Sequence, residues 1–261
     1  MNEVNKTLFI PLYGKARVSK KGIILKDPTA ERIWEAESFP IRGKSRSKWL
    51  AYNMAMRARV FDDWTNDMLA QDQEALVLHV GCGLDSRCER VLHSYKAWID
   101  CDLPEVAEIR KKYFKESDFY QIRALDATSP EQLFQLPDSR TAIVILEGVT
   151  MYLTSDQLHS FFETLQNKYG RLHILADFYT EFGARASKYK NPVNDVGVNK
   201  LYGFDDLQTV LEGLKIRFKA EHTFTPSNLI NELKPAERGI FRLLFTGKIY
   251  RKIYRLLELE M

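Results

Sequence analysis

Apolar residues recur at helical spacing in the first part of the chain. One such pattern runs from Pro28 to Ala36, and a longer one runs from Ser47 to Leu69. The apolar positions of the longer segment are Trp49, Met56, Val60, Trp64 and Leu69. Spacings of this kind are typical of helices with one buried face. We therefore predict a helical cap over residues 1–72.

The pattern then changes to short apolar runs, each followed by a loop and a more polar helical stretch. The runs are ALVLHV, AWIDCD, FYQIRAL, TAIVIL, RLHILADF and IRFKAEHTF. Several of them are apolar at consecutive positions, which is typical of strands covered on both faces. Alternating strands and helices predict βαβ units around a mostly parallel sheet. The expected fold class is α/β, with a doubly wound Rossmann-like sheet over residues 73–225.

The last segment, residues 226–261, has a different pattern. Apolar residues recur every fourth position at Phe241, Phe245, Ile249, Ile253 and Leu257. Basic residues lie between them at Arg242, Lys248, Arg251, Lys252 and Arg255. We predict an amphipathic basic helix from about Ala236 to Leu259 that packs against the domain and borders the entrance to its site. The pattern does not show which segment forms the last strand that such sheets commonly contain.

Composition narrows the class of protein. A length of 261 residues fits one domain, and 38 basic against 35 acidic residues give a net charge of +3, too small to indicate a nucleic-acid partner. No apolar run approaches the roughly 18 residues of a transmembrane helix, and the start of the chain lacks a signal-peptide core. We expect a cytoplasmic protein. The cysteines Cys82, Cys88 and Cys101 lack paired metal-ligand spacing, so no metal is expected.

A glycine turn follows the first apolar run. The strand leads directly into Gly81-Cys82-Gly83, and glycines at such a turn let the backbone lie close to a nucleotide-like ligand. An ordinary tight turn would show the same pattern. The third glycine position of a dinucleotide motif is Ser86, followed by the bulky Arg87, which disfavours a nicotinamide-binding oxidoreductase.

Carboxylates follow the later strands. Asp100 and Asp102 end the second run about 20 residues after the glycines, where an acidic group can bind ribose hydroxyls. Asp102 could instead cap the next helix. Asp126 and Glu147 follow two further runs, and Asp126 is a suitable acceptor for the exocyclic amine of adenine. Solvated loop positions are the alternative for both.

Five stretches together resemble the leucine carboxyl methyltransferase group and its bacterial polyketide O-methyltransferase relatives. They are YGKA at Tyr13–Ala16, RARVFDD at Arg57–Asp63, GCGLDSR at Gly81–Arg87, DCDLPEV at Asp100–Val106 and EGVTMYL at Glu147–Leu153. The resemblance implies a class I methyltransferase fold that uses S-adenosyl-L-methionine. It also implies a helical N-terminal cap.

The resemblance implies roles for individual residues. Arg57 is expected to hold the methionine carboxylate, with Lys15 as a second basic group at that end. The other cofactor residues that it implies are Gly81, Cys82, Gly83, Asp100, Asp102, Leu103, Asp126, Ala127 and Glu147, and Tyr152 is expected nearest the substrate. From the residues alone, Arg57 could instead form a surface salt bridge with Asp62 or Asp63, and Lys15 could be a solvated charge.

The expected activity is an O-methyltransferase acting on a carboxylate or phenol of a small, polyketide-like molecule. A carboxylate is already ionised at neutral pH, so the enzyme chiefly has to align it and exclude water. A phenol would need a base, and no residue is singled out as catalytic. The alternatives are a protein C-terminal carboxyl methyltransferase and a binding module that has lost turnover.

Overall fold

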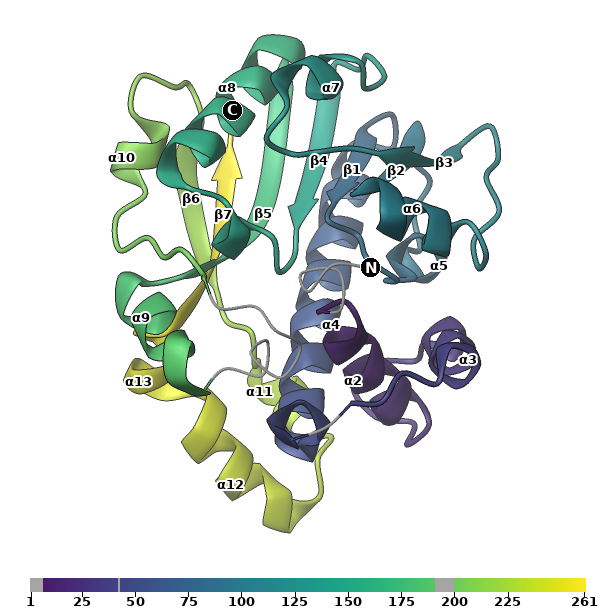
Figure 1. Ribbon diagram of the computed structural model, residues 1–261, viewed down its shortest axis with the longest axis vertical. Coiled ribbons are helices and arrows are strands. Elements are labelled where there is room, and N and C mark those ends of the chain that lie inside the picture. Colours follow the sequence, from purple (N-terminus) through teal and green to yellow (C-terminus); the bar gives the residue numbers. More distant parts are fainter. Residues whose placement is uncertain (1–6, 42, 191–199) are drawn as a thin grey trace.

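The computed structural model describes residues 7–41, 43–190 and 200–261 (Figure 1). In this part of the chain, seven strands form one sheet in the order β3-β2-β1-β4-β5-β7-β6. The strands are β1 (Leu76–Val80), β2 (Ala97–Asp102), β3 (Tyr120–Ala124), β4 (Thr141–Leu146), β5 (Arg171–Tyr179), β6 (Arg217–His222) and β7 (Tyr254–Glu260). The pairs among β1 to β5 are parallel, and β7 is antiparallel to both of its neighbours. The predicted α/β fold class is confirmed.

Helices cover both faces of this sheet. The helices that follow the strands are α5 (Arg87–Arg90), α6 (Pro104–Arg110), α7 (Pro130–Phe134), α8 (Ser155–Lys168), α9 (Glu181–Lys190) and α10 (Gln208–Leu211). In β1, Val77 packs in one hydrophobic cluster with residues of α6, while Leu76 and Leu78 pack in another with residues of α7, α8 and α10. Consecutive strand residues point to opposite faces, so burial on both faces explains the unbroken apolar runs.

The helical cap consists of α2 (Phe9–Ser19), α3 (Pro28–Glu37), the short helix η1 (Gly43–Arg46) and α4 (Lys48–Gln71). The Ser47 side chain accepts a hydrogen bond from the Trp49 amide and so caps the start of α4. Towards its end, α4 packs Trp64 and Leu69 in the cluster that contains Val77 of the sheet. In Figure 1, α4 runs from the sheet towards α2 and α3, so it connects the cap to the core.

The C-terminal segment corrects a prediction. It forms α11 (Ser227–Ile230), α12 (Pro235–Phe245), α13 (Gly247–Arg251) and then β7, rather than one helix from Ala236 to Leu259. Helix α12 ends at Phe245, because the next residue, Thr246, is extended (φ −133°) and Gly247 is left-handed (φ 83°). The apolar residues of β7 are buried because the strand lies between β5 and β6. The apolar residues at every fourth position therefore belong to a short helix followed by a strand, and their regular spacing is a coincidence. This strand is the last strand of the sheet, which the sequence analysis did not place.

In the described part of the chain, no helix has both the length and the apolar character needed to span a membrane.

Candidate cofactor and acceptor site

A cavity of about 810 Å³ lies at the carboxyl ends of the parallel strands. This volume is in the range of sites for cofactors and small molecules, and ligands of open α/β sheets bind at this edge. All but one of the predicted site residues line it: Lys15, Arg57, Gly81, Cys82, Gly83, Asp102, Leu103, Asp126, Ala127, Glu147 and Tyr152. The cavity thus brings together segments that are far apart in the sequence.

The glycine turn after β1 needs its glycines. Gly81 and Gly83 have φ values of 68° and 52°, a left-handed conformation that side chains disfavour. A Cβ added to Gly81 would lie 2.2 Å from Cγ2 of Val149. The turn is shaped both by its backbone conformation and by the close approach of the segment after β4.

Asp102 is tied to this turn. Its Oδ2 accepts a hydrogen bond from the Gly83 amide (2.7 Å), and its Oδ1 accepts one from the Leu103 amide (2.8 Å). Burial raises the pKa of Asp102 even though both amides stabilise the ionised form. The residue that caps α6 is Leu103 and not Asp102, so the structure does not support the alternative of a helix cap.

Asp100 is the predicted site residue that the structure places elsewhere. It is fully buried, forms an ion pair with Arg110, and accepts hydrogen bonds from Tyr120 Oη (2.7 Å) and Trp98 Nε1 (2.8 Å). It precedes Asp102 by two residues on the same face of β2, so its side chain lies further from the carboxyl end of the strand than that of Asp102. Its carboxylate therefore holds α6 and β3 against β2, and it is not among the residues that line the cavity.

Arg57 is held rigidly in the cavity wall. Its side chain is 7% exposed. Nε donates to Oε1 of Glu147 (2.9 Å), and Nη1 donates to Oδ2 of Asp177 (3.1 Å) and to Tyr254 Oη (3.0 Å). Burial opposes its charge, but Tyr254, Glu147 and Asp177 raise the pKa of Arg57 well above its ordinary value. A guanidinium fixed in this way is a preformed site for an anion.

The alternative roles for the two basic residues are not observed. Asp62 pairs with Arg87 and not with Arg57. Lys15 is 2% exposed and forms an ion pair with Asp85 at the glycine turn, so it is not a solvated charge. Burial disfavours ionised Asp85, but Arg90, Lys15 and Arg87 together hold the pKa of its carboxyl well below the ordinary range.

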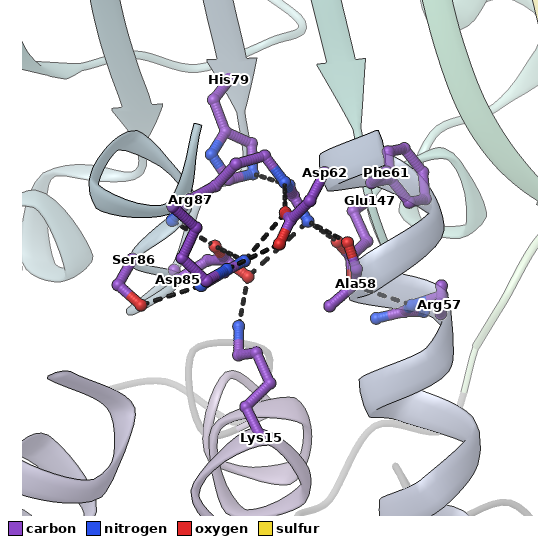
Figure 2. Close-up of polar contacts among 12 residues, drawn as sticks. Lys15, Arg57, Ala58, Phe61, Asp62, His79, Asp85, Ser86, Arg87 and Glu147 are labelled. Atoms are coloured by element: carbon purple, nitrogen blue, oxygen red, sulfur yellow. Dashed lines mark hydrogen bonds and ion pairs between the residues drawn. The ribbon is translucent and has the colours of Figure 1, made fainter. Parts of the chain in front are cut away.

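Arg87 is the centre of a buried charged network, shown in Figure 2. Its Nε donates to Asp62 (2.6 Å), its Nη2 donates to Glu147 (2.6 Å), and its Nη1 lies 3.2 Å from Nε2 of His79. Burial alone would raise the pKa of Glu147, but Arg57 and Arg87 lower it to about 2. Glu147 therefore presents an ionised carboxylate to the cavity.

Tyr254 lines this end of the cavity and is bonded to the buried Asp177, and neither residue was predicted. Asp177 lies within β5, accepts a hydrogen bond from the Gly148 amide through Oδ1 (2.7 Å), and accepts one from Tyr254 Oη through Oδ2 (2.5 Å). Burial raises the pKa of Asp177 to about 6 against the effect of Arg57 and Tyr254. An acidic residue near the end of an otherwise apolar strand was the available signal for Asp177, whereas Tyr254 belongs to the strand that was predicted as helix.

At the opposite side, Asp126 and Ala127 line the cavity after β3. Asp126 Oδ1 accepts hydrogen bonds from the amide (2.8 Å) and hydroxyl (2.7 Å) of Thr128. These bonds fix the turn and the direction of the carboxylate. Asp126 is half-buried at the cavity edge, in agreement with a wall of the ligand site.

Beyond the charged residues the cavity opens into an apolar and aromatic part, here called the chamber. The side chains that line the chamber are Trp49, Leu50, Asn53, Met54, Tyr152, Tyr179, Leu244, Phe245, Tyr250, Ile253 and Tyr254. They come from α4, η2 (Thr150–Tyr152), the end of β5, and the segment from α12 to β7. The C-terminal segment thus borders the cavity as predicted, although not as one helix.

The fold and the site define an S-adenosylmethionine-dependent methyltransferase. The leucine carboxyl methyltransferase family model matches residues 12–166, which is more than half of the chain, and the chain belongs to this family. The tetracenomycin polyketide synthesis O-methyltransferase TcmP of Streptomyces glaucescens is 27% identical over 245 residues, which are 91% of this chain and 89% of that protein.

One further relative agrees with this assignment, and one solved structure agrees in fold alone. The S-adenosyl-L-methionine-dependent methyltransferase dpfgK of Gibberella zeae is 27% identical over 192 residues, 67% of this chain and 64% of that protein. The fold is similar to that of a SAM-dependent methyltransferase from Anabaena variabilis, with a TM-score of 0.54 and 13% identity over 89% of this chain and 93% of the other. The cofactor of the present protein is therefore S-adenosylmethionine.

Proposed function

We propose that this methyltransferase transfers its methyl group to an oxygen of a small organic acid or phenol bound in the chamber. The observation that carries this proposal is the continuity of one cavity from the charged residues around Arg57 to the aromatic chamber. A cavity with a charged end and an apolar end suits a polar cofactor beside a largely apolar acceptor. The similarity to TcmP, a polyketide O-methyltransferase, supports an oxygen acceptor of this kind.

The charged end fits an amino acid group. We propose that the Nη2 edge of Arg57 and the nearby Lys15 bind the methionine carboxylate, while ionised Glu147 binds the ammonium. Arg57 uses Nε and Nη1 for its bonds to Glu147, Asp177 and Tyr254. These bonds fix the guanidinium before any ligand arrives. Such preorganisation lowers the entropic cost of binding.

The remaining cofactor contacts follow the strand ends. We propose that Asp102 binds the ribose hydroxyls, that Gly81, Cys82, Gly83 and Leu103 line the cofactor, and that Asp126 with Ala127 bounds the adenine. When bound, the cofactor supplies a methyl group on a positively charged sulfur. The residues that line the cavity would hold an acceptor oxygen in the chamber in line with this methyl group.

A carboxylate is the acceptor that this chamber suits best. It is ionised at neutral pH, so it loses no proton on methylation. A phenol would first have to lose a proton. Burial raises the pKa of Tyr152 to about 12 and that of Tyr250 above its ordinary value, so these side chains remain protonated. The chain's own contribution is then to hold the acceptor in line and to exclude water.

A methyl-transfer screen with radiolabelled S-adenosylmethionine tests this proposal. The panel contains aromatic and aliphatic acids, phenols, and peptides with free C-terminal carboxylates. We expect label in small acids, and release of that label by mild base, because esters hydrolyse and ethers do not. Label confined to the peptides would instead favour a protein C-terminus as acceptor. Binding of S-adenosylhomocysteine, measured in parallel, shows that the protein used is competent.

A further inference from the structure

One buried polar group in the chamber is unexplained by the roles assigned so far. Asn53 lies on α4, one helical turn before Arg57, and is 2% exposed. Its Oδ1 accepts a hydrogen bond from Tyr250 Oη (3.1 Å). Its Nδ2 is buried and has no hydrogen-bond partner among the residues that the structure describes. Buried donors without a partner are rare in folded proteins and destabilise them.

Asn53 lies on the face of α4 that lines the cavity. Trp49, Asn53 and Arg57 follow one another at intervals of four residues and all line the cavity, as expected for one face of a helix. Arg57 belongs to the charged end, and Trp49 belongs to the chamber. Asn53 therefore lies at the boundary between the two ends. This boundary is where the reacting oxygen of an acceptor must lie if cofactor and acceptor occupy the two ends.

Tyr250 fixes the orientation of the Asn53 amide. Burial raises the pKa of Tyr250 even though Asn53 partly opposes the shift, so the phenol remains a hydrogen-bond donor. Because this donor is directed at Oδ1, the NH₂ group of the amide is the part left for a ligand. An amide NH₂ is a donor, so its partner must be an acceptor such as a carboxylate or carbonyl oxygen.

We propose that Asn53, positioned by Tyr250, donates a hydrogen bond from Nδ2 to an oxygen of the methyl acceptor. This inference rests on the proposed function, and it specifies the acceptor class further. The acceptor is an apolar molecule with a carboxylate, in which one oxygen takes the methyl group and the other binds Asn53. A carbonyl next to a hydroxyl offers the same pair of oxygens. An isolated hydroxyl on a hydrocarbon does not.

The test compares two probes that differ only in the oxygen-bearing group, naphthoate and naphthalene. Binding to the protein saturated with S-adenosylhomocysteine is followed by fluorescence. The parent protein should bind naphthoate at least about tenfold more tightly than naphthalene, since hydrogen bonds to charged groups are among the stronger ones. Asn53→Leu should lose about tenfold in naphthoate affinity with little change for naphthalene. Tyr250→Phe should show a smaller loss of the same kind.

Two further variants keep the test decisive. Asn53→Asp retains the shape and can still accept the Tyr250 hydrogen bond, but it replaces the donor by a negative charge, so it should weaken naphthoate binding more than Asn53→Leu does. Asn167→Leu changes an exposed asparagine on α8 and should leave both probes unaffected. Equal affinity of the parent for naphthoate and naphthalene would overturn the proposal, as would unchanged naphthoate binding in either Asn53 variant.

The affinity for S-adenosylhomocysteine separates this inference from the proposed function. We expect it to be unchanged in Asn53→Leu, Asn53→Asp and Tyr250→Phe, because these residues bind the acceptor and not the cofactor. Methylation of small acids by the parent, together with unchanged probe binding in the Asn53 variants, would reject the role of Asn53 alone. If naphthoate binds through Asn53 but no acid is methylated, the proposed methylation of acids is rejected, whereas the binding role of Asn53 is supported.

Discussion

The two ends of the cavity satisfy their polar groups in opposite ways. At the charged end, Arg57 and Arg87 are already paired with Glu147, Asp177 and Asp62 before a ligand is present. In the chamber, the Nδ2 group of Asn53 has no partner among the described residues. The charged end thus binds by preorganisation, whereas the chamber keeps an unpaired donor for its ligand. Substitutions at the two ends should therefore have opposite effects on stability.

Arg57→Ala should have the largest effect. The substitution leaves Glu147 and Asp177 buried without the guanidinium, and breaking a buried ion pair from one side costs about 3–5 kcal/mol. Cofactor affinity should also fall, by more than in Lys15→Ala, because a charge-assisted contact is lost. Urea denaturation and calorimetry with S-adenosylhomocysteine measure the two effects.

Arg59→Ala is the matched control for this experiment. Arg59 lies on the same helix but forms an exposed ion pair with Asp63, and such pairs contribute about 0–1 kcal/mol. Similar stability losses in Arg57→Ala and Arg59→Ala would contradict the importance assigned to the buried pair.

Asp177 should make stability depend on pH in a defined window. Because its folded-state pKa is raised to about 6, the folded protein retains a proton that the unfolded chain has lost from about pH 4 upward. The contribution of Asp177 to the unfolding free energy therefore falls as pH rises from about 4 to 6, by about 3 kcal/mol in all. Asp177→Asn removes this titration. The stability of the parent relative to Asp177→Asn should decline across that window, and a constant difference would show that Asp177 titrates normally.

Gly81→Ala tests the close approach at the glycine turn. The added Cβ would meet Val149 at 2.2 Å, whereas at Gly22, which has a similar φ of 65°, it would meet nothing within 4 Å. Gly81→Ala and the control Gly22→Ala both place a side chain on left-handed backbone. The difference between their stabilities therefore measures the steric clash at Gly81, which we expect to cost about 1–3 kcal/mol. Cofactor affinity should fall only in Gly81→Ala. Equal melting temperatures of the two variants would contradict a steric clash between residue 81 and Val149.

The double variant Asn53→Leu with Tyr250→Phe should have the smallest effect on stability and the opposite sign. It removes both partners of one hydrogen bond together with the unpaired Nδ2 donor, so it should raise the free energy of unfolding by up to about 1 kcal/mol. Asn53→Leu alone leaves the Tyr250 hydroxyl without its acceptor and should not show this gain. A clear destabilisation of the double variant, measured by urea denaturation, would show that the amide serves the fold and not a ligand.

The sequence predicted the charged end better than the chamber, and the reason is physical. Glycines with positive φ and carboxylates at strand ends are required at fixed places next to a strand, so they leave a local pattern at Gly81, Asp102 and Glu147. The walls of the chamber are apolar residues such as Met54 and Phe245. These cannot be distinguished by type from residues of an ordinary core.

The site residues that the sequence did not reveal make hydrogen bonds to residues far away in the chain. Asn53 and Tyr250 are 197 positions apart, and Tyr254 and Asp177 are 77 positions apart. Tyr254 belongs to strand β7 and Tyr250 to the short helix α13 before it, whereas the apolar spacing predicted one helix through both. The burial of Asp100 away from the cavity was not evident for a related reason, because the sequence shows a strand with two acids but not which of them lines the cavity.

A crystal structure of the complex with S-adenosylhomocysteine tests the division of the cavity most directly. We expect the ligand carboxylate within hydrogen-bond distance of Arg57, the ribose on Asp102 and the adenine beside Asp126 and Ala127. The ligand should leave the Nδ2 group of Asn53 without a contact, so that the chamber stays available to the acceptor. A ligand whose adenosyl group lies in the chamber against Trp49 and Asn53 would contradict the account.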